Sequence, residues 1–172
     1  MAGGGSLKAW LRPGALRLRL LPLLALFLLS ACSEQELSPE EQVIQAIESL
    51  QAAVEAGSLS EASGWIAGNY RDRYHPDKRA AVSTLFRYTR RHKNLYLFSR
   101  IQEVEILPGG TRATAVVQVA MTAQPVESAQ TLLQLKADLY RFDVQLAWNE
   151  DENTWQVTGS SWKRANLGGL RG

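Results

Sequence analysis

Acid–base chemistry is the first chemistry to look for in this sequence, and three side chains are candidates for it. Asp72 and His75 lie close together in NYRDRYHP, a stretch between two expected helices, and Asp138 lies in the long apolar segment 133–148. A carboxylate or an imidazole acts as a general acid or base when it faces a pocket that tunes its pKa. These three residues are the catalytic candidates.

Each candidate also has a purely structural explanation. Asp72 stands between two arginines, and His75 precedes a proline, which disfavours the helical conformation at that residue. Asp138 alternates out of phase with Leu135 and Leu139, so it faces outward if those leucines face inward. No set of residues demands catalysis, and the sequence favours a non-catalytic protein over an enzyme.

Metal and cofactor chemistry finds no support in the sequence. The chain has two histidines and one cysteine and contains neither HExxH nor CxxC, so no spacing suits a metal ion. Its PGG stretch belongs to an expected hairpin rather than to a phosphate-binding loop. The net charge of the 172 residues is only +2, which gives no reason to expect nucleic acid as a partner.

The single cysteine, Cys32, follows a segment with the features of a secretion signal. Four basic residues and no acidic ones precede it, and the apolar run LLPLLALFLL occupies residues 20–29. Ten helical residues span about 15 Å, roughly half of a bilayer's hydrocarbon core, so a permanent membrane span is disfavoured. Residues 1–31 are predicted to be a signal peptide.

Leu29-Ser30-Ala31-Cys32 resembles the lipobox of bacterial lipoproteins. The resemblance implies cleavage before Cys32 and acylation of this cysteine by diacylglycerol and an amide-linked chain such as palmitate, which would anchor the protein. The alternative is an ordinary secretion signal that ends near a cysteine, but a lone thiol has no disulfide partner in the chain. Ser33 favours the outer over the inner membrane of the bacterial envelope. Residues 32–38 then form a short tether, and the domain faces the periplasm.

Three helices are expected after the tether. Ser38, Pro39 and Glu41 form a capping-box pattern, and Gly57 can end the helix that follows. Ser58 and Glu61 repeat the pattern and begin a shorter helix that should bury Trp65 and Ile66. Asp77 caps a third helix that ends near Asn94, with Val82, Leu85 and Phe86 facing inward.

Four strands are expected after Asn94, because the apolar pattern changes to period two. Leu95, Leu97 and Ile101 share one phase and Val104 and Ile106 the other. The segment from Leu133 to Trp148 also changes phase, between Leu139 and Phe142. The change within this long strand predicts a bulge or a sharp bend. Trp148 and Trp155 flank the last turn and can form a cross-strand pair.

This order of elements resembles the nuclear-transport-factor-2-like (NTF2-like) superfamily, which includes SnoaL-like cyclases and ketosteroid isomerases. The resemblance covers Ser38 to Arg164, so we expect a domain at 39–164 and a frayed tail at 165–172. It implies an α+β fold in which three N-terminal helices pack on a strongly curved, cone-like, four-stranded antiparallel sheet with a pocket between the layers. The candidates for that pocket, which core packing also explains, are Trp65, Tyr70, Tyr96, Phe98, Tyr140 and Trp148.

Basic residues gather in one part of the chain. Residues 71–100 hold nine bases against two acids. A cluster at the end of the third helix suits the helix dipole, and it also suits an anionic lipid, a cell-wall polymer or an acidic protein. The anion-binding candidates are Arg87, Arg90, Arg91 and Lys93.

The sequence thus predicts a membrane-anchored periplasmic lipoprotein without a metal or cofactor. Its domain is expected to bind a small apolar ligand or a protein partner, either another envelope protein or a second copy of itself. One alternative is an acid–base enzyme of the isomerase or cyclase type. The other is a binder of anionic envelope lipid or polymer through the basic helix.

Overall fold

The structure is a computed structural model that describes residues 36–92, 94–126, 131–132 and 138–165. Cys32 and the signal segment, Lys93, and the expected strand residues 133–137 lie outside this set, as does the side chain of Asp138. No helix among the described residues is long and apolar enough to cross a membrane.

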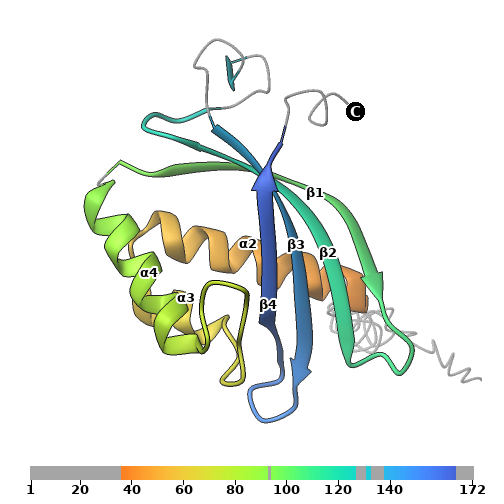
Figure 1. Cartoon of the computed structure of the whole chain (residues 1–172). Coiled ribbons are helices and arrows are strands. Elements are labelled where there is room, and N and C mark those ends of the chain that lie inside the picture. The colour runs from red at the N-terminus through yellow and green to blue at the C-terminus, as the bar shows by residue number, and fades with distance from the viewer. Residues whose placement is uncertain (1–35, 93, 127–130, 133–137, 166–172) are drawn as a thin grey trace, which may run out of the picture. The chain divides into compact units, whose positions relative to one another are not determined.

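Three helices precede four antiparallel strands, which confirms the expected α+β class. The helices are α2 (Pro39–Glu55), α3 (Leu59–Gly64) and α4 (Lys78–Arg91). The strands are β1 (Tyr96–Ile106), β2 (Arg112–Thr122), β3 (Asp138–Asn149) and β4 (Thr154–Arg164), paired in the order β1-β2-β3-β4. The helices lie against one face of this sheet (Figure 1).

The start of α2 has the predicted capping box. The backbone N–H of Ser38 donates to Glu41 Oε2 at 2.7 Å, and that of Glu41 donates to Ser38 Oγ at 3.3 Å. Gly57 has a φ of +67° just past the end of the helix, a conformation that glycine adopts without strain.

The second helix differs from the prediction. The Ser58 side chain makes no capping bond, and α3 ends at Gly64. Trp65 and Ile66 therefore follow the helix, and Ile66 forms a parallel bridge with Val157 of β4. The backbone here hydrogen-bonds to the sheet edge, which competes with continuation of the helix.

The third helix begins as predicted, with Ala80 N–H donating to Asp77 Oδ1 at 2.8 Å. It ends at Arg91 rather than near Asn94. Val82 and Leu85 pack on the core, as predicted. Phe86 is 41% exposed, so the predicted inward position of Phe86 is wrong. Ala81 and Leu85 are four positions apart and lie on the inward face of α4. Phe86 is one position further along, so its side chain points away from that face.

The bulge predicted in the long strand is not found at its change of phase. The pairing of β2 with β3 runs without a shift from Asp138 to Ala147, and the pairing of β3 with β4 shifts only later, between Gln145 and Leu146. Leu139 instead packs with Ala120 and Leu132 in a second apolar cluster, so the phase change in β3 reflects burial on both faces of the sheet. The pairing of β1 with β2 also shifts, between Ile101 and Glu103.

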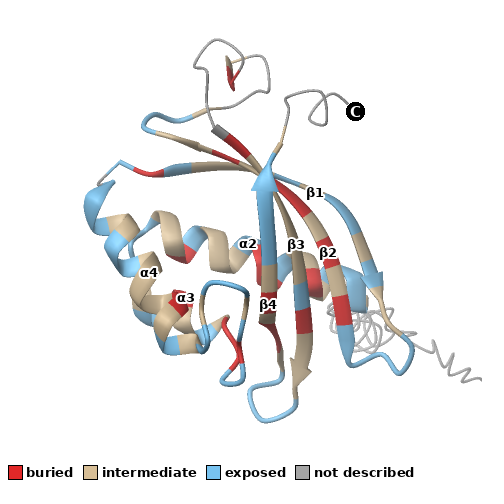
Figure 2. Ribbon diagram, viewed as in Figure 1, coloured by how far each residue is buried: buried red, intermediate tan, exposed pale blue. Residues whose placement is uncertain are grey.

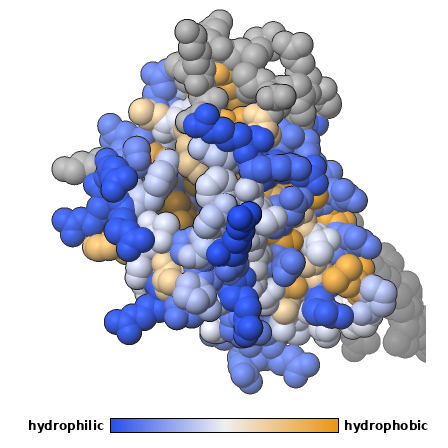
Figure 3. Space-filling model, viewed as in Figure 1, coloured by the Kyte–Doolittle hydropathy of each residue, from blue (hydrophilic) through white to orange (hydrophobic). Residues whose placement is uncertain are grey.

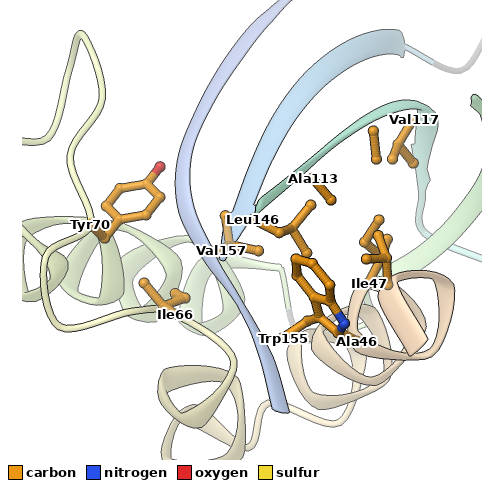
Figure 4. Close-up of a cluster of buried hydrophobic side chains, with 12 residues drawn as sticks. Ala46, Ile47, Ile66, Tyr70, Ala113, Val117, Leu146, Trp155 and Val157 are labelled. Carbon is orange, nitrogen blue, oxygen red and sulfur yellow. The ribbon is translucent and has the colours of Figure 1, made fainter. Parts of the chain in front are cut away.

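The main core lies between α2 and the sheet, and buried positions follow both elements (Figure 2). Trp148 and Trp155 are register partners with ring centroids 5.9 Å apart, which confirms the predicted cross-strand pair. In Figure 4, Trp155 lies beside Ala46 of α2 and Leu146 of β3.

Candidate functional site

A cavity of about 520 Å³ lies between the helices and the sheet. Leu50 of α2 and Leu85 of α4 line it from the helical layer. Val119 of β2 and Val144 of β3 line it from the sheet. Figure 3 shows a recess with a hydrophobic floor between the hydrophilic surfaces of α4 and β4.

The strand pattern places apolar side chains in this cavity. Val117, Val119 and Met121 alternate along β2, and Phe142 and Val144 do the same along β3, so all of them reach one face of the sheet. Both strands are antiparallel and paired without a shift, which keeps these side chains in adjoining rows.

The loop between α3 and α4 supplies a polar cluster to the cavity wall. Tyr70, Asp72 and His75 all line the cavity. The Tyr70 hydroxyl donates to Asp72 Oδ2 at 2.5 Å, and His75 Nδ1 lies 2.8 Å from the same oxygen. The Asp72 side chain is only 3% exposed and that of His75 19%.

Local backbone bonds fix the loop that carries these groups. Asp72 Oδ1 accepts the backbone N–H groups of Tyr74 at 2.6 Å and His75 at 2.7 Å, as an Asp side chain does in a turn. The Arg71 N–H donates to the Thr158 carbonyl of β4 at 3.1 Å, which ties the loop to the sheet edge. The carboxylate therefore shapes the loop as well as facing the cavity.

The electrostatics of the cluster keep Asp72 ionised and Tyr70 protonated. Burial raises the pKa of Asp72, but the hydrogen bonds from Tyr70, His75 and the two backbone amides outweigh burial, so the pKa lies below its usual range. Burial, followed by the hydrogen bond to Asp72, raises the pKa of Tyr70 to about 12, against a smaller lowering effect of Ser160.

The hydrogen-bond chain continues beyond His75. His75 Nε2 lies 3.1 Å from Thr84 Oγ1 of α4, and Arg87 Nη2 donates to the same oxygen at 2.9 Å. Because an ionised Asp72 only accepts, His75 Nδ1 carries the proton between them. The Thr84 hydroxyl is then free to donate to Nε2 of a neutral His75, which satisfies both ring nitrogens.

Two of the six pocket candidates, Tyr70 and Tyr140, line the cavity. Trp65 and Trp148 instead pack against the main core, and Phe98 packs against the second cluster on the other sheet face. Tyr96 is 40% exposed at the start of β1. The aromatic residue type therefore did not distinguish residues that line the cavity from residues that pack in the core.

The anion-binding candidates Arg87, Arg90 and Arg91 are exposed on α4. Arg87 reaches Thr84 at the cavity wall, and the Arg90 guanidinium lies 5.3 Å from the Phe86 ring centroid. Lys93 and the side chain of Asp138 lie outside the described residues; the Asp138 backbone pairs with Met121. Among the described residues, no three His, Cys, Asp or Glu side chains gather to hold a metal ion.

Thr84 and Ser160 also belong to the polar cluster, although no sequence pattern indicates it. Ser160 lies 3.0 Å from the Tyr70 hydroxyl, ninety positions away in the chain. Hydroxyl side chains are common on helix and strand surfaces, so only the fold shows which of them reach a site.

Comparison with known proteins supports the fold and nothing finer. No family model and no curated protein matches the chain. An NTF2-like protein of Pseudomonas putida is 14% identical at a TM-score of 0.55, over 77% of this chain and 91% of that one. A ketosteroid isomerase-like protein of Erwinia carotovora atroseptica is 11% identical at a TM-score of 0.53. The match covers 74% of this chain and 96% of that one.

A third match is Bd1075 of Bdellovibrio bacteriovorus, 9% identical at a TM-score of 0.55. It spans 73% of this chain but only 40% of Bd1075, so the match concerns one part of that longer protein. At identities this low the likeness shows the fold alone. The chain has an NTF2-like fold, as the sequence resemblance implied.

Proposed function

We propose that this protein binds a small, largely apolar ligand in the cavity between its helices and its sheet, without transforming it. The observation that carries the proposal is the cavity itself: about 520 Å³, lined mainly by aliphatic and aromatic side chains. Its wall holds two polar groups, the cluster around Asp72 and the hydrogen-bonded pair Gln51 and Ser99. Ligand pockets combine this size and composition, in which apolar surface supplies affinity and a few polar groups supply orientation.

The bonding of Asp72 favours binding over catalysis. Its oxygens already accept from Tyr70, from the His75 ring and from two backbone amides. A general base needs a free lone pair and a pKa close to the working pH. The hydrogen bonds to Asp72 occupy its lone pairs, and they lower its pKa further from neutral pH. Asp72 is better suited to holding the loop than to accepting a proton from a ligand.

Acid–base catalysis of the isomerase or cyclase type is the second candidate, and one observation favours it. Asp72 orients the His75 ring, whose other nitrogen lies 3.1 Å from Thr84 Oγ1, and both His75 and Thr84 line the cavity. A ligand that displaced Thr84 from Nε2 would meet a histidine oriented by a carboxylate. Conversion of a β,γ-unsaturated ketone to its conjugated isomer, lost in His75→Ala, would establish this candidate in place of simple binding.

We also propose that the protein is a lipoprotein anchored through Cys32, on the outer membrane in preference to the inner, with its domain in the periplasm. The lipobox-like sequence and the unpaired cysteine support this location. Mass spectrometry of the full chain expressed in a Gram-negative bacterium should find an acylated Cys32, and Cys32→Ala should abolish acylation. An unmodified, soluble product of the unaltered chain would disprove the anchor.

A neutral dye tests binding in the cavity. Nile red should bind the protein with a blue-shifted emission, and Val119→Trp should reduce this binding at least tenfold because the indole projects into the space that the dye occupies. Val116→Trp is the matched control, since Val116 precedes Val117 on β2 and faces the other side of the sheet. Equal dye binding by both variants would place the dye elsewhere and refute the proposal.

A further inference from the structure

Resting on the proposed function, we infer the class of ligand: a single-chain amphiphile with an anionic head, held with its hydrocarbon chain in the cavity and its head against Arg91. Four observations lead to this assignment. They are a second cavity that adjoins the first, the kind of residues that line each, the bonding of Arg91, and the bonding of Asp72.

The second cavity has a volume of about 570 Å³ and adjoins the first at the C-terminal end of α4. The two cavities share the lining residues Tyr88, Leu95, Met121 and Tyr140. In the proposed complex, a ligand longer than the first cavity extends past these shared side chains into the second.

The two cavities differ in polarity. The first is lined mainly by aliphatic side chains of the helices and the sheet. The second adds Arg91, His92 and Asn94 at the end of α4 and Thr122 at the end of β2. An apolar chamber that leads to a polar one with a guanidinium complements an amphiphile rather than a wholly apolar molecule.

Arg91 is available to such a head group. It is exposed, and none of the described carboxylates forms an ion pair with it. Among the residues that the structure describes, none of those lining the second cavity carries a carboxylate. Arg90 and Arg91 both lie in the last turn of α4, where a cation offsets the helix dipole, but only Arg91 lines the cavity. The dipole explains a basic last turn without explaining which arginine faces the cavity.

The other polar end of the first cavity is unsuited to an anionic head. Asp72 carries a negative charge there, and the Tyr70 hydroxyl and the His75 Nδ1 proton are directed to it. The Ser160 and Thr84 hydroxyls are paired with Tyr70 and His75. An anion placed beside Asp72 would meet a like charge and donors already in use, so the head lies at the Arg91 end.

The test is displacement of Nile red from the full chain by decanoate, decanol and decyltrimethylammonium, which share one chain length. Decanoate should bind about tenfold more tightly than decyltrimethylammonium, and the difference should shrink in high salt. Longer carboxylates should bind more tightly by up to about fourfold per methylene until the cavities are full. Decyl phosphate in a parallel titration distinguishes a phosphate from a carboxylate head.

Arg91→Gln and Arg90→Gln form a matched pair, since each removes one charge from the same helical turn. Arg91→Gln should weaken decanoate binding about tenfold and leave decanol binding unchanged, because a charged hydrogen bond is lost. Arg90→Gln should change neither by more than about twofold.

The outcomes separate this inference from the proposed function. One outcome is that decanol displaces the dye in a manner that Val119→Trp abolishes, while decanoate binds no more tightly than decyltrimethylammonium. This result would overturn the inference and leave cavity binding intact. Equal effects of the two arginine variants would also overturn it. Failure of every ligand to displace a dye that Val119→Trp excludes would overturn the inference alone. Dye binding that Val119→Trp leaves as strong as Val116→Trp does would remove the proposed function and the inference together.

Discussion

The Asp72 carboxylate and the His75 ring are joined by a 2.8 Å contact between Oδ2 and Nδ1, while Oδ1 accepts the backbone N–H of His75 as well. One side chain thus fixes both the ring and the backbone of another residue three positions on. This pair forms the charged part of the cavity wall, and its consequences for stability and for pH dependence can be measured.

Asp72→Asn should lower the free energy of unfolding by about 2 kcal/mol, because charge-assisted hydrogen bonds to a nearly buried carboxylate are lost. Urea denaturation at pH 7 measures the change. Asp151→Asn is the control: Asp151 is exposed in the β3–β4 turn, so its change should stay within about 0.5 kcal/mol. Equal effects of the two substitutions would show that the Asp72 bonds contribute nothing to the fold.

The contribution of Asp72 should disappear in acid. The pKa of this carboxyl is below its ordinary 3.8 in the folded protein, so the unfolded chain takes up the proton first. The stabilisation is therefore complete well above pH 3.8 and is lost as the pH falls through the folded pKa. The difference in unfolding free energy between the wild type and Asp72→Asn should narrow between about pH 5 and pH 2. A difference that stays constant over that range would contradict the lowered pKa.

Tyr70 should give the opposite dependence at alkaline pH. Burial, then the hydrogen bond to Asp72, raises the pKa of Tyr70 from 10.0 to about 12, so the unfolded chain loses this proton first as the pH rises. Stability is then lost progressively from pH 10 upward, by about 2–3 kcal/mol in total. Tyr70→Phe should remove this part of the alkaline loss, as followed by urea denaturation at pH 8 to 11. Tyr74→Phe, at a 57% exposed ring, is the control and should follow the wild type.

Gly159 sets how closely the Tyr70–His75 loop approaches β4. A Cβ at this position would lie 3.0 Å from the Arg71 carbonyl oxygen and 3.2 Å from Gln145 Oε1. Gly159→Ala should therefore destabilise the protein by about 1–3 kcal/mol and also weaken Nile red binding, since the loop must move away from the sheet.

Gly64→Ala is the matched control for this position. A Cβ there meets no atom within 4 Å, and Gly64 lies in α3. The substitution should leave dye binding unchanged and alter stability by less than about 1 kcal/mol, in the stabilising direction. A stability loss at Gly64 as large as that at Gly159 would contradict the crowding argument.

The elements of this fold were predictable where a local signal specifies them. The Ser38–Glu41 capping box and the Asp77 cap depend on neighbouring residues, and both are present. The bulge after Ile101 coincides with the change of phase between Ile101 and Val104, so it too has a local signal in the sequence. Leu139 shows the limit of that reasoning, because a phase change in β3 arose from burial against Leu132 on the other sheet face.

The site was less predictable than the fold. Asp72, His75, Tyr70 and Tyr140 were candidates by residue type, and all four line the cavity. Their assembly depends on partners distant in the sequence, such as Ser160, which no spacing rule connects to Tyr70. Separating cavity aromatics from core aromatics requires knowing which strand positions face α4 and which face α2.

Ligand binding in the cavity is tested most directly by native mass spectrometry of the full chain, purified from the cell that produces it. We expect a small-molecule adduct that is lost on denaturation, is retained in Val116→Trp and is absent in Val119→Trp, whose indole projects into the cavity. A bare protein mass in all three samples, or an adduct that Val119→Trp carries as fully as the wild type, would contradict ligand binding in this cavity.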